Sequence, residues 1–231
     1  MNIHGFNKTT LLDYPGLLAS TVFTGGCNLR CPFCHNGDLV LHPEIYPAIS
    51  EEEVLEHLRK RANIIKGVCI TGGEPTLQKD LPAFIDSIKS VGLKVKLDTN
   101  GFNPDCLSEL IHSGSLDYIA MDIKGGRSGY GNCVGIKDID IKRFDKSIEL
   151  IMSSSVPYEF RTTAVKGLHT EEDFLDIREW ISNAGQYYIQ SYTYRDTVID
   201  KKCSAFTKEE LEHFINIVRS SIPAASLRGV D

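Results

Sequence analysis

The sequence predicts an α/β fold, a partial and open (β/α)6 barrel around a parallel sheet. Short apolar runs alternate with longer amphipathic segments, and this pattern occurs six times along the chain. Such regular alternation gives a parallel sheet with right-handed crossovers. A closed barrel needs eight units and about 250 residues, whereas this chain has 231 residues. A doubly wound parallel sheet remains the alternative.

Each unit opens with a run that is typical of a strand. The second run, GVCIT, is short and almost continuously apolar, as expected for a strand that is buried on both faces. Two glycines, Gly72 and Gly73, interrupt the chain directly after it. The expected strands are 17–24, 67–71, 94–98, 117–122, 158–165 and 186–192.

Helix start and stop signals follow the strands. Serine or threonine with an acidic residue three positions later predicts a helix N-terminus. The pairs with this spacing are Ser50 with Glu53, Thr170 with Asp173 and Thr207 with Glu210. Pro82 suits a first helical turn, and Gly92 suits a helix end. The expected helices are 50–65, 82–92, 103–114, 139–152, 170–185 and 207–221.

Composition limits the class of protein. With 42% hydrophobic residues the chain can bury one core, so we expect a single domain over 1–231, with 1–16 as an N-terminal extension that packs near the site. The net charge of −6 argues against non-specific nucleic-acid binding. The N-terminus lacks the pattern of a signal peptide, and no apolar run is long enough to span a membrane. We therefore expect a cytoplasmic protein without nucleic-acid or membrane partners.

Three of the seven cysteines, Cys27, Cys31 and Cys34, lie within eight residues after the first strand. Thiolates are the ligands that iron–sulfur clusters prefer, and a cluster used only for electron transfer normally has four of them. Three ligands therefore predict a [4Fe–4S] cluster with one open iron, which indicates chemistry. Zinc with His35 as fourth ligand is the alternative, but His35 directly follows Cys34, which makes tetrahedral closure awkward. The other cysteines are expected to be structural: Cys69, Cys106, Cys133 and Cys203.

Polar residues follow all the expected strands. Because the carboxyl ends of parallel strands meet at one edge, these residues are expected to converge on one mouth. They are the cysteine loop 27–34, Gly72 to Pro75, Asp98 to Asn100, Asp122 to Lys124, Arg161 to Lys166 and Gln190 to Tyr192.

The spacing Cys-x-x-x-Cys-x-x-Cys after the first strand, with Gly-Gly-Glu-Pro after the second, resembles the radical S-adenosylmethionine (SAM) enzymes. The resemblance implies a partial (β/α)6 barrel. It also implies that the amino and carboxylate groups of SAM chelate the open iron. Reductive cleavage of SAM then yields methionine and a 5′-deoxyadenosyl radical.

A finer resemblance points to the activases of glycyl radical enzymes. The segments that are similar to activase signatures are Cys34-His35-Asn36, Asp98-Thr99-Asn100-Gly101 and Met121-Asp122-Ile123-Lys124. A fourth segment, Leu12-Asp13-Tyr14-Pro15-Gly16, resembles the activating proteins of anaerobic ribonucleoside-triphosphate reductases. This implies a glycyl radical enzyme as protein substrate and flavodoxin or a ferredoxin-type protein as electron donor.

Three alternatives remain. A pyruvate formate-lyase activase is less well matched, because 130–135 lacks the histidine expected there. A radical SAM enzyme that modifies a peptide or small molecule, such as a 7-deazapurine-forming synthase, would share the cluster but not Cys34-His35-Asn36. A non-catalytic iron–sulfur or zinc protein that binds a partner is the non-enzymatic alternative.

The resemblance implies roles at the methionine end of SAM. Gly72, Gly73, Glu74 and Pro75 would bind the amino group, although a tight turn would also explain the glycines. Arg161 would face the carboxylate of SAM, with a solvent-facing arginine as the alternative.

Asp98 and Asp122 end adjacent strands, and paired carboxylates repel unless a cation or hydrogen bonds lie between them. Lys124 can supply that charge. The resemblance implies a monovalent cation here, or contacts of Asp98, Asn100 and Asp122 to the methionine and ribose. An internal Asp–Lys ion pair is the structural alternative.

The remaining roles concern adenine and the protein substrate. The backbone of Phe33, Cys34 and His35 would contact adenine, with a hydrophobic plug as the alternative for Phe33. Gln190 and Tyr192 share one face of the last strand and could line the adenine pocket. The remaining residue, Asp13, would hold the glycine loop of the substrate near the cluster, unless it only forms a turn.

Overall fold

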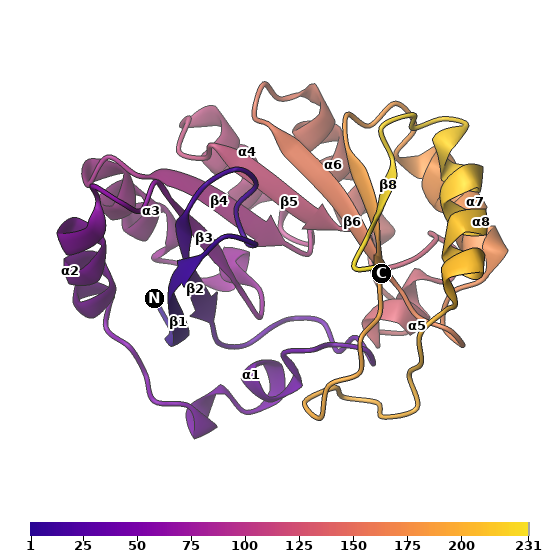
Figure 1. The fold of residues 1–231 in the computed structure, drawn as a ribbon, viewed down its shortest axis with the longest axis horizontal. Helices are drawn as coiled ribbons and strands as arrows, with labels where there is room; N and C mark the ends of the chain where they lie inside the picture. Colours follow the sequence, from indigo (N-terminus) through magenta and orange to yellow (C-terminus); the bar gives the residue numbers. More distant parts are fainter. Residues whose placement is uncertain (231) are drawn as a thin grey trace.

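A computed structural model describes residues 1–230 as helices packed on one curved sheet (Figure 1). The sheet has eight strands in the order β1 to β8, and β1 is antiparallel to β2 while all later neighbours are parallel. The strands are β1 Ile3–Thr10, β2 Ala19–Thr24, β3 Gly67–Gly72, β4 Lys94–Thr99, β5 Tyr118–Asp122, β6 Tyr158–Ala164, β7 Tyr187–Ser191 and β8 Ser226–Arg228.

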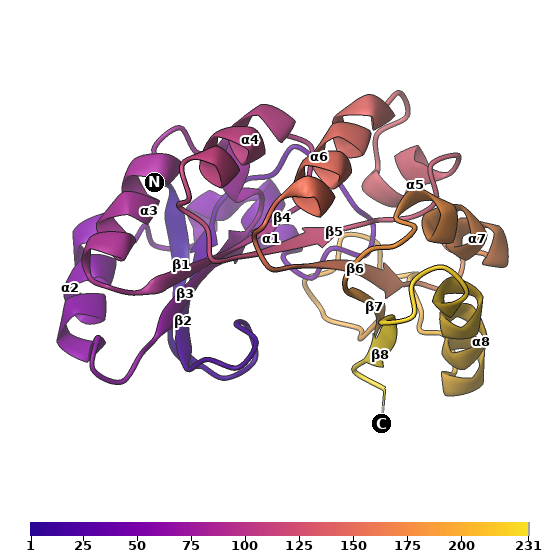
Figure 2. The same ribbon diagram turned by 90° about the horizontal axis from the view of Figure 1, so that it is seen from above.

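The longer helices lie along the convex face of this sheet (Figure 2). They are α2 Glu51–Arg61, α3 Leu81–Ser90, α4 Pro104–His112, α6 Ile141–Ser153, α7 Glu171–Trp180 and α8 Lys208–Arg219. Short helices are α1 Gly37–Leu41, η1 Pro43–Ile45, η2 Pro75–Leu77 and α5 Tyr130–Val134. Fully buried side chains such as Phe84, Val95 and Phe144 fill the space between helices and sheet. The concave face is left for the loops and polar residues.

The predicted fold class is confirmed, and the six expected strands correspond to β2 to β7. The count of six was wrong, because β1 and β8 extend the sheet at its two edges. Within the expected N-terminal extension 1–16, residues Ile3 to Thr10 form β1 and pair with β2. Neither edge strand has a clear sequence signal: β1 is mostly polar, and β8 has only three residues.

Several helix boundaries also differ from the expectation. Helix α2 ends at Arg61 rather than at 65. Ile65 lies after the helix and is buried in the core, at 1% exposure. Helix α5 was not expected, and it places Cys133 in a buried helix rather than in a loop. A tertiary contact stabilises this short helix, because the ring centroid of Tyr130 lies 4.6 Å from that of Phe144.

The expected capping residues act as such. Ser50 accepts a hydrogen bond from Glu53 N at 3.1 Å, which is half of a capping box. At α8 the box is complete, since Glu210 N donates to Thr207 Oγ1 at 3.2 Å and Thr207 N donates to Glu210 Oε2 at 2.7 Å.

The topology brings all loops that follow the parallel strands to one end of the sheet. The cysteine loop follows β2 at that end, whereas the loop between β1 and β2 lies at the opposite end, where Thr10 pairs with Ala19. The sheet does not close, because β1 and β8 each have only one neighbour. Figure 2 shows the resulting opening between the two edges. Among the described residues, no helix is both long and apolar enough to cross a membrane.

Candidate active site

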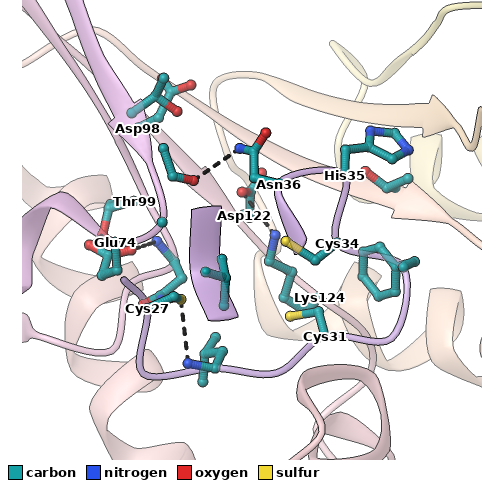
Figure 3. Close-up of a pocket in the computed structure, with 18 of the residues that line it drawn as sticks. Cys27, Cys31, Cys34, His35, Asn36, Glu74, Asp98, Thr99, Asp122 and Lys124 are labelled. Atoms are coloured by element: carbon teal, nitrogen blue, oxygen red, sulfur yellow. Dashed lines mark hydrogen bonds and ion pairs between the residues drawn. The ribbon is translucent and has the colours of Figure 1, made fainter. Parts of the chain in front are cut away.

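A cavity of about 250 Å³ opens at the carboxyl ends of β2 to β7. Its wall combines thiols, carboxylates and cations from loops far apart in the sequence (Figure 3). The lining residues are Cys27, Leu29, Cys31, Phe33, Cys34, His35, Asn36, Val40, Thr71, Gly72, Gly73, Glu74, Asp98, Thr99, Asn100, Asp122, Lys124, Arg161, Thr163 and Gln190. The predicted convergence of the strand ends on one mouth therefore holds in this structure.

Backbone hydrogen bonds shape the cysteine loop. Gly26 N donates to Leu39 O at 3.0 Å, Arg30 N donates to Val134 O at 2.8 Å, and Cys34 N donates to Cys31 O at 3.0 Å. These bonds hold the loop to α1 and α5 and turn it between its second and third cysteines. In Figure 3 the sulfur atoms of the three cysteines point into one shared space.

Burial disfavours the thiolate form of each of these cysteines in the free protein. Burial raises the pKa of Cys27 to about 11 and that of Cys31 to about 12. It also raises the pKa of Cys34, and the nearby Lys124 ammonium lowers the pKa of all three thiols in part. Ligation to a metal requires loss of these protons, so iron binding at this site is expected to strengthen as the pH rises.

The donor set fits a multi-iron cluster. Three free thiols line one side of the cavity, which matches soft thiolate ligation with one iron left without a protein ligand. Within residues 1–230, no three His, Cys, Asp or Glu side chains lie close enough together to bind a single metal ion. His35 lies against Tyr192, with ring centroids 5.6 Å apart.

The two glycines after β3 allow a close approach to the cysteine loop. Gly73 N donates to Thr24 O at 2.8 Å, and Glu74 N donates to Gly26 O at 2.9 Å. A Cβ on Gly73 would lie 1.9 Å from Gly26 O, and Gly72 has φ +118°, which only glycine adopts readily. The tight turn is therefore present and forms part of the cavity wall, and binding of the methionine amino group by these glycines stays a prediction.

The Glu74 carboxylate is 1% exposed and accepts four hydrogen bonds. Oε1 accepts from Thr76 N, Thr76 Oγ1 and Thr99 Oγ1, and Oε2 accepts from Asn100 N at 2.7 Å. Burial raises the pKa of Glu74, although these donors oppose the shift. The carboxylate thus ties the end of β3 to the end of β4. Pro75 begins η2 and does not line the cavity.

An ion network spans the ends of β4, β5 and β6. Arg161 Nε donates to Asp122 Oδ1 at 3.0 Å, and Arg161 Nη1 donates to Asp98 Oδ2 at 3.2 Å. Lys124 Nζ donates to Asp122 Oδ2 at 3.0 Å, and Lys96 Nζ donates to Asp98 Oδ1. Arg161 therefore faces inward, at 13% exposure, and lies between the two carboxylates.

These cations keep both carboxylates ionised. Burial alone would raise the pKa of Asp122, but Arg161 and Lys124 lower it to about 2. Arg161 and Lys96 likewise lower the pKa of Asp98 against the effect of burial. The expected Asp–Lys pair is present, and the sequence interpretation missed that Arg161 and Lys96 complete it. The monovalent cation stays a prediction.

Besides Pro75, two predicted site residues lie outside the cavity. Tyr192 is 3% exposed and packs behind His35. Of the two residues predicted to line the adenine pocket from the last expected strand, only Gln190 lines the cavity. Asp13 lies in the loop between β1 and β2, and its Oδ2 accepts from Thr21 Oγ1 at 2.5 Å. Asp13 is therefore separated from the cysteine loop, which follows the other end of β2, and its role in holding the glycine loop of the substrate stays a prediction.

Two further lining residues were expected only as members of longer segments. Thr163 belongs to the expected group Arg161 to Lys166, and the alternation of side chains along a strand places it on the same face as Arg161. Asn36, previously only part of a motif, donates from Nδ2 to Gly72 O at 3.0 Å and links the cysteine loop to the glycine turn.

Comparison with known proteins gives the family. The profile of the Radical SAM superfamily matches residues 21–181. A "putative glycyl-radical enzyme activating enzyme" of Methanocaldococcus jannaschii is 32% identical over 235 residues, which cover 99% of this chain and 96% of that protein. A 7-carboxy-7-deazaguanine synthase of Hyperthermus butylicus is 37% identical over 92 residues, covering 39% of this chain and 38% of that enzyme.

Solved structures share the fold. SuiB of Streptococcus suis with bound SAM aligns with a TM-score of 0.70 at 17% identity, covering 88% of this chain and 48% of SuiB. Coproporphyrinogen III oxidase of Escherichia coli aligns with a TM-score of 0.61 at 13% identity, covering 91% of this chain and 54% of that enzyme. The chain thus spans about half the length of these two enzymes, and at such identities the likeness shows the fold alone. The superfamily match over most of the chain is the stronger finding, and it shows that this protein belongs to the radical SAM superfamily of enzymes, which implies a [4Fe–4S] cluster and SAM.

Proposed function

We propose that this protein is a radical SAM activase that generates a glycyl radical on a partner enzyme, and that this partner is an anaerobic ribonucleoside-triphosphate reductase. The observation that carries the proposal is the pairing of a three-thiol cavity with a sheet that stays open between β1 and β8. The near full-length similarity to the archaeal relative supports the same target class.

The three cysteines would hold the cluster and leave one iron for SAM. Gly72 and Gly73 place backbone groups beside the cysteine loop, where the amino group of methionine would bind. Arg161 uses Nε and Nη1 for Asp122 and Asp98, which leaves Nη2 as a donor for a carboxylate. Phe33, His35 and Gln190 would line the adenine end.

The ion network would orient SAM without changing its own protonation. Asp122 is ionised at neutral pH, because its pKa is about 2, and Lys124 beside it stays protonated because its pKa is raised. Such prearranged charges need little reorganisation when a substrate binds. Asp98, Asn100 and Asp122 would then contact the methionine and ribose.

When bound, the cluster and SAM supply a 5′-deoxyadenosyl radical that takes a hydrogen atom from a glycine of the partner. The protein must bring that glycine beside the cavity and exclude water. The open side of the barrel offers a path for a protein loop, and Asp13 lies at the far end of the same strands. We propose that Asp13 contacts the glycine loop of the partner. The electron would come from flavodoxin or a ferredoxin-type protein.

The test is anaerobic reconstitution with iron and sulfide, followed by reduction in the presence of SAM. We expect 5′-deoxyadenosine, and a glycyl radical EPR signal when the partner reductase is added. If no 5′-deoxyadenosine forms, the proposal that this protein cleaves SAM would be wrong. With 5′-deoxyadenosine but no radical on a glycyl radical enzyme, only the target would be wrong.

A small-molecule reaction is the second candidate, and the partial similarity to a 7-carboxy-7-deazaguanine synthase favours it. The two candidates differ in where deuterium goes. A glycyl radical enzyme deuterated at glycine would transfer deuterium to 5′-deoxyadenosine. An enzyme that acts on a small molecule would leave the deuterated protein unchanged and give 5′-deoxyadenosine without deuterium from it.

A further inference from the structure

The side chain of Asn100 reaches from the end of β4 to the first cysteine of the cysteine loop. Its Nδ2 lies 3.7 Å from Cys27 Sγ and 2.9 Å from Asn28 Oδ1. This contact joins two loops that are 73 positions apart in the sequence. It is a side-chain N–H···S contact to one of the three candidate cluster ligands.

The orientation of the Asn100 amide is determined by its neighbours. Phe102 N donates to Asn100 Oδ1 at 2.9 Å, so the oxygen faces away from the sulfur and Nδ2 faces it. The carbonyl Oδ1 of Asn28 accepts the second N–H of the same group. Asn100 is 6% exposed, and its backbone N–H is held by Glu74 Oε2. A flip of the amide would place Oδ1 against both Asn28 Oδ1 and the thiolate.

A second N–H group approaches the same sulfur atom, since Leu29 N lies 3.4 Å from Cys27 Sγ. The sulfur atom of Cys27 therefore faces two donors, one from the backbone of the cysteine loop and one from the side chain of Asn100.

We propose that Asn100 is a positioning residue that raises the reduction potential of the cluster by donating an N–H···S hydrogen bond to the Cys27 thiolate, with Asn28 holding the amide in place. Reduction adds one electron, and thus one negative charge, to the cluster and its thiolates. A donor at sulfur stabilises the more negative state more strongly, which is one of the ways proteins set cluster potentials. This inference rests on the proposed cluster, and it adds a role for Asn100 that is distinct from contact with SAM.

The test is an EPR-monitored redox titration of the reconstituted full chain, with dithionite as reductant and without SAM. In Asn100→Ala we expect the equilibrium constant for one-electron reduction of the cluster to fall about tenfold. This corresponds to a midpoint potential that is lower by about 59 mV. Asn100→Asp should lower the potential further, because a carboxylate replaces the donor. Asn103→Ala is the matched control, since Asn103 donates to Thr76 O from the same loop and is not bonded to any of the thiols.

A midpoint potential in Asn100→Ala equal to that of the unaltered protein, at equal iron content, would overturn the inference. A residue that only bound SAM would change the KM for SAM and leave this SAM-free potential unchanged. If Asn100→Ala does not retain its iron, Asn28→Ala decides: it removes the acceptor that holds the amide and should lower the potential by less, and no shift would overturn the inference. Failure of the unaltered protein to take up a [4Fe–4S] cluster would instead contradict the proposed function.

Discussion

The two walls of the cavity are preorganised by different physics. The cysteine loop and the glycine turn are held by short backbone hydrogen bonds and by the absence of side chains at Gly72 and Gly73. The opposite wall, at the ends of β4 to β6, is held by ion pairs around Arg161. A metal-binding loop needs exact backbone geometry, whereas a wall that receives a charged substrate needs fixed charges. We therefore expect substitutions in the cysteine loop and glycine turn to impair the cluster and SAM cleavage, and substitutions in the ionic wall to reduce stability.

The largest effect is expected from the cysteine loop. Cys31→Ala should abolish the cluster and all SAM cleavage, because two thiolates cannot hold it. Iron content and 5′-deoxyadenosine measure this, and Cys106→Ala, at a half-buried cysteine outside the cavity, is the control. Retention of a full cluster in Cys31→Ala would contradict the ligand assignment.

On the ionic wall, Arg161→Leu should lower the free energy of unfolding by about 3 kcal/mol, because it leaves two half-buried carboxylates with less compensation. Urea denaturation measures the loss. Arg127→Leu, which breaks an ion pair whose arginine is 43% exposed, should cost at most about 1 kcal/mol. Equal losses for the two variants would show that the Arg161 network is no more than a surface ion pair.

At the glycine turn, Gly73→Ala should leave the fold intact but displace the cysteine loop, because the new methyl group would overlap Gly26 O. A displacement of about 1 Å at the site is expected to reduce the rate of SAM cleavage about 100-fold. Gly185→Ala is the control, since its Cβ would meet Tyr158 Oη at an ordinary 3.6 Å. Unchanged rates in Gly73→Ala would mean that the turn does not position the loop.

The ionic wall should also make stability depend on acid pH. The pKa of Asp122 is lowered from 3.8 to about 2 in the folded protein. A lowered pKa stabilises the fold above the unfolded value, and this contribution is lost as the pH falls from about 4 to about 2. Thermal unfolding of the unaltered protein and of Asp122→Asn across that range measures the effect. The variant should show a shallower decline, and an equal slope would argue against the shift.

The smallest effect is expected behind the cysteine loop. The hydroxyl group of Tyr192 is buried and has no hydrogen-bond partner among the described residues. Tyr192→Phe removes an unsatisfied polar group, so we expect the melting temperature to stay the same or rise slightly. A marked loss of stability or of SAM binding would show that the hydroxyl group does have a partner in the working enzyme.

Much of the barrel and of the site could be predicted from the sequence. Strands β2 to β7 each combine an apolar run with a following turn or cap, and these are local signals. The cysteine spacing and Gly72-Gly73-Glu74-Pro75 are local as well. By contrast, β1 pairs only because β2 offers a free edge, and α5 exists because Tyr130 packs on Phe144. Such elements depend on partners that are distant in the chain.

The sequence by itself therefore determined the order of β2 to β7 and their longer helices, the three thiols and the polar residues at the strand ends, because periodicity, caps and ligand spacing act over a few residues. Only the tertiary structure decided that Arg161 turns inward between Asp98 and Asp122, that Asp13 lies at the far end of the barrel, and that Asn100 reaches Cys27. These arrangements depend on sheet register and on the side of the strand that is buried. Both are set by pairing between segments that the sequence separates by many positions.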